Sequence, residues 1–255
     1  MSRGAAKTGW SVEISEERGV RYLHFGSHYV QGAMRIARPY TLELEYTRDL
    51  MFPLLLREAS WPATILQIGL GAASITRFLH RHRPDAKMTV VEISPEVVAA
   101  ARQFFKLPEE PVQRLRVEIA EGHEYLMGSK RRYDLIVVDG FDDRGGSGML
   151  DTLPFYLNCR SKLAVDGMMS VNLLTRRRGA DPAIARLREA FEDRVLVVPP
   201  SADGNTVALA AVGSPSALDI RELRLAAEKM KKATGLDLNN AVARIAMVYG
   251  GKIAF

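Results

Sequence analysis

Short apolar segments alternate with amphipathic segments along most of the chain, from Ala63 onward. The apolar segments have the length of buried strands, and the amphipathic segments have the spacing of helices that cover a sheet on one side. This alternation predicts βαβ units and a parallel sheet. The expected strands are 65–69, 88–93, 115–119, 135–139 and 168–173, and the expected helices are 72–81, 95–105, 123–127, 153–164 and one that begins at Asp181-Pro182.

The end of this pattern differs from its beginning. Two apolar segments, 194–198 and 206–211, are joined by residues rich in Pro, Asp and Gly. That connection is too short for a crossover helix, so the two strands should form a hairpin. A seventh strand inserted antiparallel is typical of the Rossmann-like methyltransferase fold, an α/β fold with a mostly parallel seven-stranded sheet, and argues against a nicotinamide dehydrogenase. Residues 217–248 predict two further helices, divided near Gly235.

The beginning of the chain has a third pattern. Apolar and polar residues alternate over 10–36 between turn residues, which predicts a small antiparallel β unit. Apolar residues at helical spacing from Tyr40 to Glu58 predict one helix leading into the sheet. We therefore expect a short tail and β unit over 1–39, and a Rossmann-like nucleoside-binding catalytic domain with C-terminal helices over 40–255.

Composition adds few restrictions. Hydrophobic residues make up 47% and charged residues 25% of the 255 residues, as in ordinary globular proteins. The net charge of +5 comes from Lys and Arg spread along the chain, so we interpret it as solvated surface and expect no nucleic-acid partner.

The single Cys159 cannot form an internal disulfide and lies in an apolar helical pattern, which indicates core packing. No segment approaches the roughly 20 apolar residues of a membrane span, so we expect no membrane contact and a cytoplasmic protein.

The first candidate for chemistry is the glycine loop Ile65-Leu-Gln-Ile-Gly69-Leu-Gly71-Ala-Ala-Ser74, where a strand turns into a helix. Glycines let a ligand approach the backbone, although a packed turn without a ligand would carry them too. Glu92 follows at the end of the next strand, at the distance along the chain where an acid meets a ribose diol. The pair predicts an adenosine-type ligand. Ser74 at the usual third glycine and the reversed final strand favour a sulfonium nucleoside over a dinucleotide.

Acids also follow the third and fourth strands. Glu121-Gly122 stands where a carboxylate meets the adenine amino group, although Glu121 could instead be an acid at a helix N-terminus. His123 is expected to begin that helix rather than to catalyse. Asp139 ends the fourth strand, and it can accept a proton from an incoming amine or orient it, or merely cap the loop; Asp142 can hold a cationic group. No His/Cys cluster has metal-ligand spacing, so no metal is expected.

These segments, in this order, resemble the spermidine synthase (polyamine aminopropyltransferase) family over residues 20–211, and most of all its bacterial spermidine-synthase-like branch. Two earlier segments share the resemblance, Val30-Gln-Gly-Ala-Met34 and Leu44-Glu-Tyr-Thr47. It implies a homodimer and the following roles: Asp139 and Asp142 catalytic; Gly69, Gly71, Glu92, Ile93, Glu121 and Gly122 for the nucleoside; Gln31, Tyr46 and Asp142 for the substrate.

The resemblance also has departures. The aspartate that pairs with the amine of decarboxylated S-adenosylmethionine in the family is Ala72 here, Tyr46-Thr47-Arg48 replaces a Tyr-His-Glu element, and Asp143 replaces a proline. The expected function is transfer of an aminopropyl group from that nucleoside to an amine acceptor such as putrescine. The alternatives are a methyltransferase that uses intact S-adenosylmethionine on an unknown small substrate, and a non-catalytic nucleoside-binding module.

Overall fold

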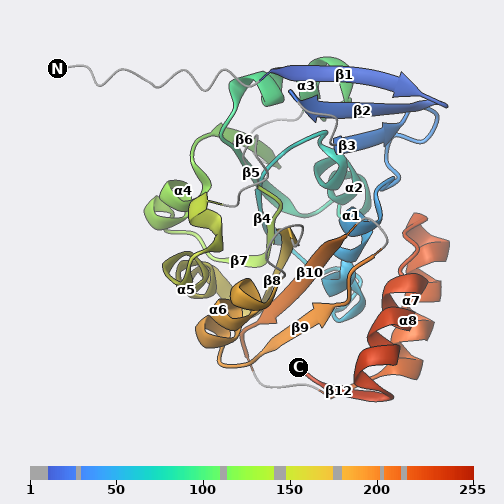
Figure 1. Ribbon diagram of the computed structural model, residues 1–255, viewed down its shortest axis with the longest axis vertical. Coiled ribbons are helices and arrows are strands. Elements are labelled where there is room, and N and C mark those ends of the chain that lie inside the picture. Colours follow the sequence, from blue (N-terminus) through green and yellow to red (C-terminus); the bar gives the residue numbers. More distant parts are fainter. Residues whose placement is uncertain are drawn as a thin grey trace.

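The computed structural model describes residues 11–26, 30–109, 114–140, 148–174, 180–201, 204–213 and 217–255. Its centre is a seven-stranded sheet in the order β6-β5-β4-β7-β8-β10-β9 (Figure 1). β10 lies antiparallel between β8 and β9, so the predicted hairpin and the Rossmann-like methyltransferase fold are confirmed. The strands are β4 Thr64–Ile68, β5 Lys87–Glu92, β6 Leu115–Ile119, β7 Tyr133–Val138, β8 Leu163–Leu174, β9 Val195–Val198 and β10 Asn205–Ala211.

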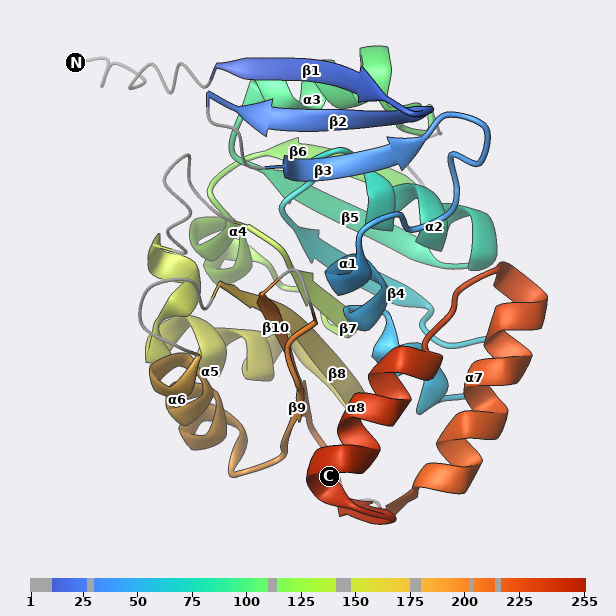
Figure 2. The ribbon, with the colours of Figure 1, turned by 45° about the vertical axis from the view of Figure 1, so that its right-hand side comes forward.

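Helices cover both faces of this sheet (Figure 2). One core joins a sheet face to α2 (Ser74–His82), α3 (Pro95–Phe104) and the C-terminal helices. The other core joins the opposite face to α4 (Gly122–Gly128), α5 (Leu153–Lys162) and α6 (Asp181–Phe191). Cys159 is fully buried in this second core, where burial raises the pKa of its thiol, so the predicted packing role is confirmed.

The predicted N-terminal β unit is also confirmed. β1 (Val12–Glu17), β2 (Val20–Phe25) and β3 (Val30–Arg35) form an antiparallel sheet in that order. Leu23, Phe25 and Met34 of this sheet share a small apolar cluster with residues of the glycine loop and of α3. The β unit therefore packs directly on the loop expected to bind the nucleoside.

The single helix predicted over Tyr40–Glu58 is wrong. This segment forms one helical turn, α1 (Glu45–Asp49), followed by a 3-10 turn, η1 (Phe52–Leu55). Pro53 explains the break, because proline lacks the N–H that would continue the helix and its ring clashes with the preceding turn. The apolar spacing was nevertheless informative, since Leu50, Phe52 and Leu54 are all buried.

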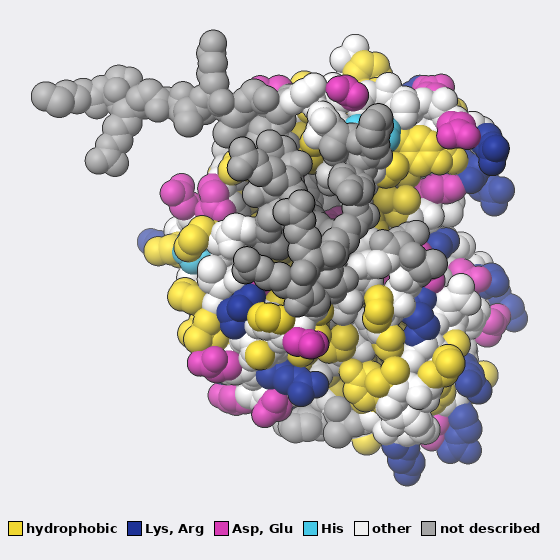
Figure 3. Space-filling view, in the orientation of Figure 1, with side chains coloured by type: hydrophobic (Ala, Val, Ile, Leu, Met, Phe, Trp, Pro, Cys, Tyr) yellow, Lys and Arg dark blue, Asp and Glu magenta, His cyan; other side chains and the backbone are white. Residues whose placement is uncertain are grey.

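Two helices close the chain, as predicted. α7 (Ile220–Thr234) ends at Gly235, which adopts a left-handed conformation with φ of 77°, and α8 (Asn239–Tyr249) follows. A two-stranded ladder between β11 (Ala217–Asp219) and β12 (Lys252–Ala254) joins the ends of this hairpin and was not predicted. Exposed Lys and Arg side chains lie over the hairpin (Figure 3). Among the described residues, no helix is both long and apolar enough to cross a bilayer.

Candidate active site

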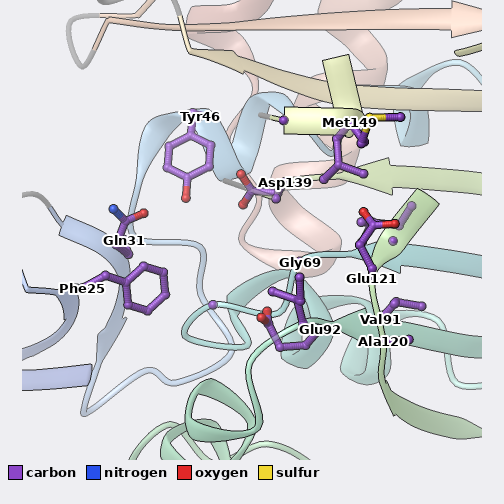
Figure 4. Close-up of a pocket in the computed structure, with 17 residues that line it drawn as sticks. Phe25, Gln31, Tyr46, Gly69, Val91, Glu92, Ala120, Glu121, Asp139 and Met149 are labelled. Atoms are coloured by element: carbon purple, nitrogen blue, oxygen red, sulfur yellow. The ribbon is translucent and has the colours of Figure 1, made fainter. Parts of the chain in front are cut away.

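A cavity of about 290 Å³ lies at the carboxyl ends of β4, β5 and β7, between the sheet, the N-terminal β unit, α1 and the turn η2 (Gly148–Asp151) (Figure 4). Ligands of doubly wound sheets bind at this edge. Asp142 lies outside the described residues. All the other predicted site residues line this cavity: Gln31, Tyr46, Gly69, Gly71, Glu92, Ile93, Glu121, Gly122 and Asp139.

Gly69 lets the carboxyl ends of β4 and β7 approach each other closely beside the cavity. Its φ is +91°, and a Cβ there would lie 2.1 Å from the carbonyl oxygen of Asp139. The buried Gln67 fixes the same turn, because its amide donates to the Gly69 carbonyl at 2.7 Å and accepts from Thr76 at 2.9 Å. The glycine loop is therefore held in shape by the protein itself.

Glu92 lies under the glycine loop and faces the cavity. Its carboxylate is buried and accepts hydrogen bonds from the backbone N–H groups of Leu70, at 2.8 Å, and Ser94, at 3.0 Å. Burial raises the pKa of Glu92, and these backbone hydrogen bonds oppose the rise. A carboxylate oxygen accepts more than one hydrogen bond, so Glu92 retains the capacity to bind the hydroxyls of a ribose.

Glu121 caps a helix and also lines the cavity. Its carboxylate accepts from the backbone N–H of Glu124 at 2.8 Å and so caps α4, and the residue also lines the cavity. Gly122 lets the N-terminus of α4 pack on β4, because a Cβ there would lie 2.5 Å from a methyl group of Ile68. His123 does not line the cavity; its ring lies 6.0 Å from that of Phe155.

Asp139 directly follows β7 and is the carboxylate on the side of α1. The amide nitrogen of Asn172 donates to its Oδ1 at 3.0 Å, and the Tyr46 side chain forms a second hydrogen bond with it. Burial raises the pKa of Asp139 to about 6, the hydrogen bonds from Asn172 and Tyr46 oppose this, and the charge of Glu92 adds to it. At neutral pH the group is mainly ionised, yet it is a stronger base than an ordinary carboxylate.

Asn172 is a site residue that the sequence did not reveal. It lies on β8, the neighbouring strand of β7, and its Oδ1 is buried without a hydrogen-bond partner among the described residues. A second residue that was missed is Arg77 of α2, whose buried guanidinium donates to the carbonyls of Ala72, Phe105 and Pro39. It fixes the glycine loop from behind, and burial lowers its pKa to about 9.

Ala72 borders a smaller adjoining cavity of about 20 Å³, together with Gln31, Thr47 and Asp139. Its methyl group is buried directly beneath β3, since a Cβ on Gly32 would lie 2.5 Å from it. The position where the family has an acid is therefore apolar and tightly covered. Among the described residues, no group of three or more His, Cys, Asp or Glu side chains could hold a metal ion.

The arrangement has the chemistry of a small-molecule site. Apolar side chains of Phe25, Ile68, Val91 and Leu150 line the main cavity, and its carboxylates come from separate strand ends. An apolar slot with a few convergent polar groups is typical of small-molecule sites.

Comparisons with known proteins agree with this geometry. The family model described as spermine/spermidine synthase domain matches residues 43–173. A polyamine aminopropyltransferase of Neisseria meningitidis is 38% identical over 242 residues, covering 93% of this chain and 90% of the relative. A probable spermidine synthase from Corynebacterium glutamicum has a similar structure, with a TM-score of 0.68 at 18% identity over 92% of this chain and 96% of the other. Human methyltransferase-like protein 13, solved with SAH, has a TM-score of 0.67 at 24% identity over 75% of this chain and 93% of the other.

Proposed function

The chain belongs to the spermine/spermidine synthase family, and we propose that it transfers an aminopropyl group from decarboxylated S-adenosylmethionine to an amine acceptor such as putrescine. It is accordingly a transferase enzyme. The observation that carries the proposal is the position of Asp139: a carboxylate with raised pKa, hydrogen-bonded to Asn172 and Tyr46, in one cavity with Glu92 and Glu121.

The nucleoside is assigned to the β4, β5 and α4 side of the cavity. Glu92 accepts hydrogen bonds from the ribose hydroxyls, and Glu121 with Gly122 meets the adenine. Ile93 supplies apolar contact, and Gly69 with Gly71 lets the nucleoside approach the backbone. This orientation is supported by the order of the strand ends, since Asp139 then lies beside the sulfonium.

The reaction is a displacement at the carbon next to the sulfonium. The acceptor nitrogen forms a new C–N bond while the C–S bond breaks, and the electron pair of that bond leaves with sulfur as neutral methylthioadenosine. An amine needs its lone pair for this step, so Asp139 takes up or orients the amine proton. Holding the nitrogen in line with the C–S bond supplies much of the acceleration. Gln31 and Tyr46 are assigned to the substrate side, and Asp142, outside the described residues, is assigned to the second amine of the acceptor.

One observation favours a second candidate. Ala72 is assigned to the donor tail by the family resemblance and carries no charge, so in that assignment the carboxylate of intact S-adenosylmethionine meets no repulsion from it. Methyl transfer would use the same cavity with a different carbon as the target, which is why the donor must be tested directly.

The test offers the purified chain each nucleoside in turn with a series of linear diamines. Formation of methylthioadenosine from the decarboxylated nucleoside, together with a polyamine product, supports the proposal. Formation of S-adenosylhomocysteine from the intact nucleoside alone would replace it with methyl transfer. The homodimer and the cytoplasmic location expected from the sequence stay predictions, to be checked by light scattering and by cell fractionation.

A further inference from the structure

The single turn α1 is bound at both ends by one side chain from the end of the chain. Arg244 of α8 donates through Nη1 to Glu45 at 2.6 Å and through Nη2 to Asp49. Glu45 and Asp49 are the first and last residues of α1, four positions apart and so on one face of the turn. Nε of Arg244 donates to the carbonyl of Pro199 at 3.0 Å, which ties the same guanidinium to the end of β9.

α1 depends on such contacts because it is too short to be stable alone. It has five residues. Its N-cap residue is Leu44, whose side chain cannot form a capping hydrogen bond. Forming a first helical turn costs more than its few hydrogen bonds return. The ion pair with Arg244 is also well shielded, because the Asp49 side chain is only 5% exposed. Arg244 is therefore a principal anchor of α1.

Tyr46, which lies between Glu45 and Asp49 in the chain, belongs to the site. Tyr46 follows Glu45 directly, and its ring lines both cavities. Its side chain forms a hydrogen bond with Asp139. Figure 2 shows α8 beside α1, on the side away from the N-terminal β unit. The contacts thus run without a gap from the C-terminal hairpin to the carboxylate in the cavity.

We propose that Arg244 is a positioning residue of the active site: by holding α1 from the C-terminal hairpin, it places the Tyr46 side chain against Asp139. The inference rests on the proposed function only for the role of Asp139 in turnover. No residue of α7 or α8, both described in full, lines either cavity, so the C-terminal hairpin serves the reaction through α1, by fixing the protonation behaviour of the Asp139 carboxylate.

The groups around Asp139 and Asp49 decide in which direction the pKa of Asp139 shifts when Arg244 is lost. Asp139 faces Asn172 from β8, Tyr46 from α1 and Glu92 from β5. Asp49 faces Arg244, Glu45 and Arg48, and burial raises its pKa to about 6 while Arg244 opposes that rise. Loss of Arg244 loosens α1 and weakens the hydrogen bond from Tyr46, which stabilises the ionised form of Asp139. The pKa of Asp139 then rises, and the acidic limb of the pH profile moves to higher pH.

The test compares Arg244→Lys and Arg244→Gln with the wild type. The pKa of Asp139 is measured from its ¹³C carboxyl resonance, assigned with Asp139→Asn, and the pH profile of kcat/KM is measured in parallel. We expect the pKa and the acidic limb to rise together by about 0.5–1 pH unit, and kcat/KM at pH 6, where half of the wild-type carboxylate is already protonated, to fall by about two- to fivefold. Arg244→Lys should retain more of the kcat/KM at pH 6 than Arg244→Gln, because it keeps the positive charge. Binding of the nucleoside should change less than about twofold, since its assigned residues lie on other elements.

Two further variants complete the design. Asp49→Asn removes the charge pair between Arg244 and Asp49 but leaves the pair between Arg244 and Glu45. It replaces the Arg244 variants in the test if they do not fold. Arg160→Lys is the matched control: Arg160 likewise binds a carbonyl, of Ala190 at 3.0 Å, and a carboxylate, of Glu192 at 2.6 Å, between α5 and the end of α6. It should leave the pKa of Asp139 unchanged.

A double-mutant comparison isolates the path through the tyrosine. Tyr46→Phe should raise the pKa of Asp139 by itself, and adding Arg244→Lys should raise it no further. Folded Arg244 variants with an unchanged pKa of Asp139, or an equal shift in the Tyr46→Phe background, would overturn the inference. A wild type without transferase activity would refute the proposed function but leave the NMR titration decisive.

Discussion

Replacing Asp139 with Asn should make the protein less active and, at neutral pH, more stable. The amide has the shape of the carboxylate and can still accept the hydrogen bond that Asn172 donates. It cannot take a proton, so turnover should fall by roughly 10² to 10⁴ if Asp139 is the general base. Affinity for the nucleoside should stay within a few fold.

The gain in stability follows from the pKa of this group. Burial raises it from an ordinary 3.8 to about 6, so keeping the carboxylate ionised in the folded state costs up to about 3 kcal/mol. A raised pKa stabilises the fold fully below the unfolded value of 3.8, and this contribution is lost as the pH rises through about 6. Asn carries no charge, so the variant should match the wild type near pH 4 and exceed it by up to about 3 kcal/mol at pH 7.5. Because Asp139 is only partly buried beside the open cavity, water there makes this figure an upper bound.

Urea unfolding at pH 4, 6 and 7.5, with turnover measured on the same samples, tests both effects. Asp134→Asn is the matched control at the other end of β7, where the carboxylate accepts from the backbone N–H groups of Ala63 at 2.9 Å and Thr64 at 2.8 Å. That variant should lose stability and keep its turnover per folded molecule. Full activity in Asp139→Asn would remove the proposed mechanism, and a stability difference that does not change with pH would refute the argument from burial.

Three further changes test the binding side of the cavity. Glu92→Gln should weaken nucleoside binding by about 1.5–3 kcal/mol for each charge-assisted hydrogen bond to the ribose that is lost, measured by calorimetry; equal affinity would show that Glu92 does not bind the ribose. Gly69→Ala should cost at least about 2 kcal/mol in urea unfolding, because φ is +91° and the new methyl group would lie 2.1 Å from the Asp139 carbonyl oxygen; an unchanged midpoint would show that the strand ends can separate. Ala72→Asp should shift the ratio of the two nucleoside affinities toward the decarboxylated one by at least about tenfold, since an added carboxylate attracts its ammonium and repels the carboxylate of the intact molecule; an unchanged ratio would show that position 72 does not face the donor tail.

Local sequence patterns were sufficient for most of the fold. Most strands of the sheet contain a short apolar segment, and the hairpin of β9 and β10 follows from the length and composition of one connection. The failure over residues 40–58 also has a local cause. Its buried apolar positions have helical spacing, but Pro53 ends the helix, and apolar spacing alone cannot distinguish one long helix from two short turns.

The residues that support the site could not be predicted in this way. Glu92 ends β5, while Glu121 and Asp139 follow β6 and β7, and the topology of a parallel sheet brings such positions together. Asn172 lies within a strand, 33 residues from the Asp139 that it contacts, and Arg244 lies 195 residues from Asp49. Neither is marked by a motif or by spacing, because each contact is created only when distant elements pack.

The most direct test of the central claim is a competition between the two donors in one reaction. The purified chain is given equal concentrations of intact and decarboxylated S-adenosylmethionine with putrescine, and the nucleoside products are quantified by mass spectrometry. Aminopropyl transfer predicts methylthioadenosine together with an acceptor heavier by one aminopropyl group, and both products should fall together in Asp139→Asn. S-adenosylhomocysteine as the main nucleoside product, with a methylated acceptor, would contradict the account.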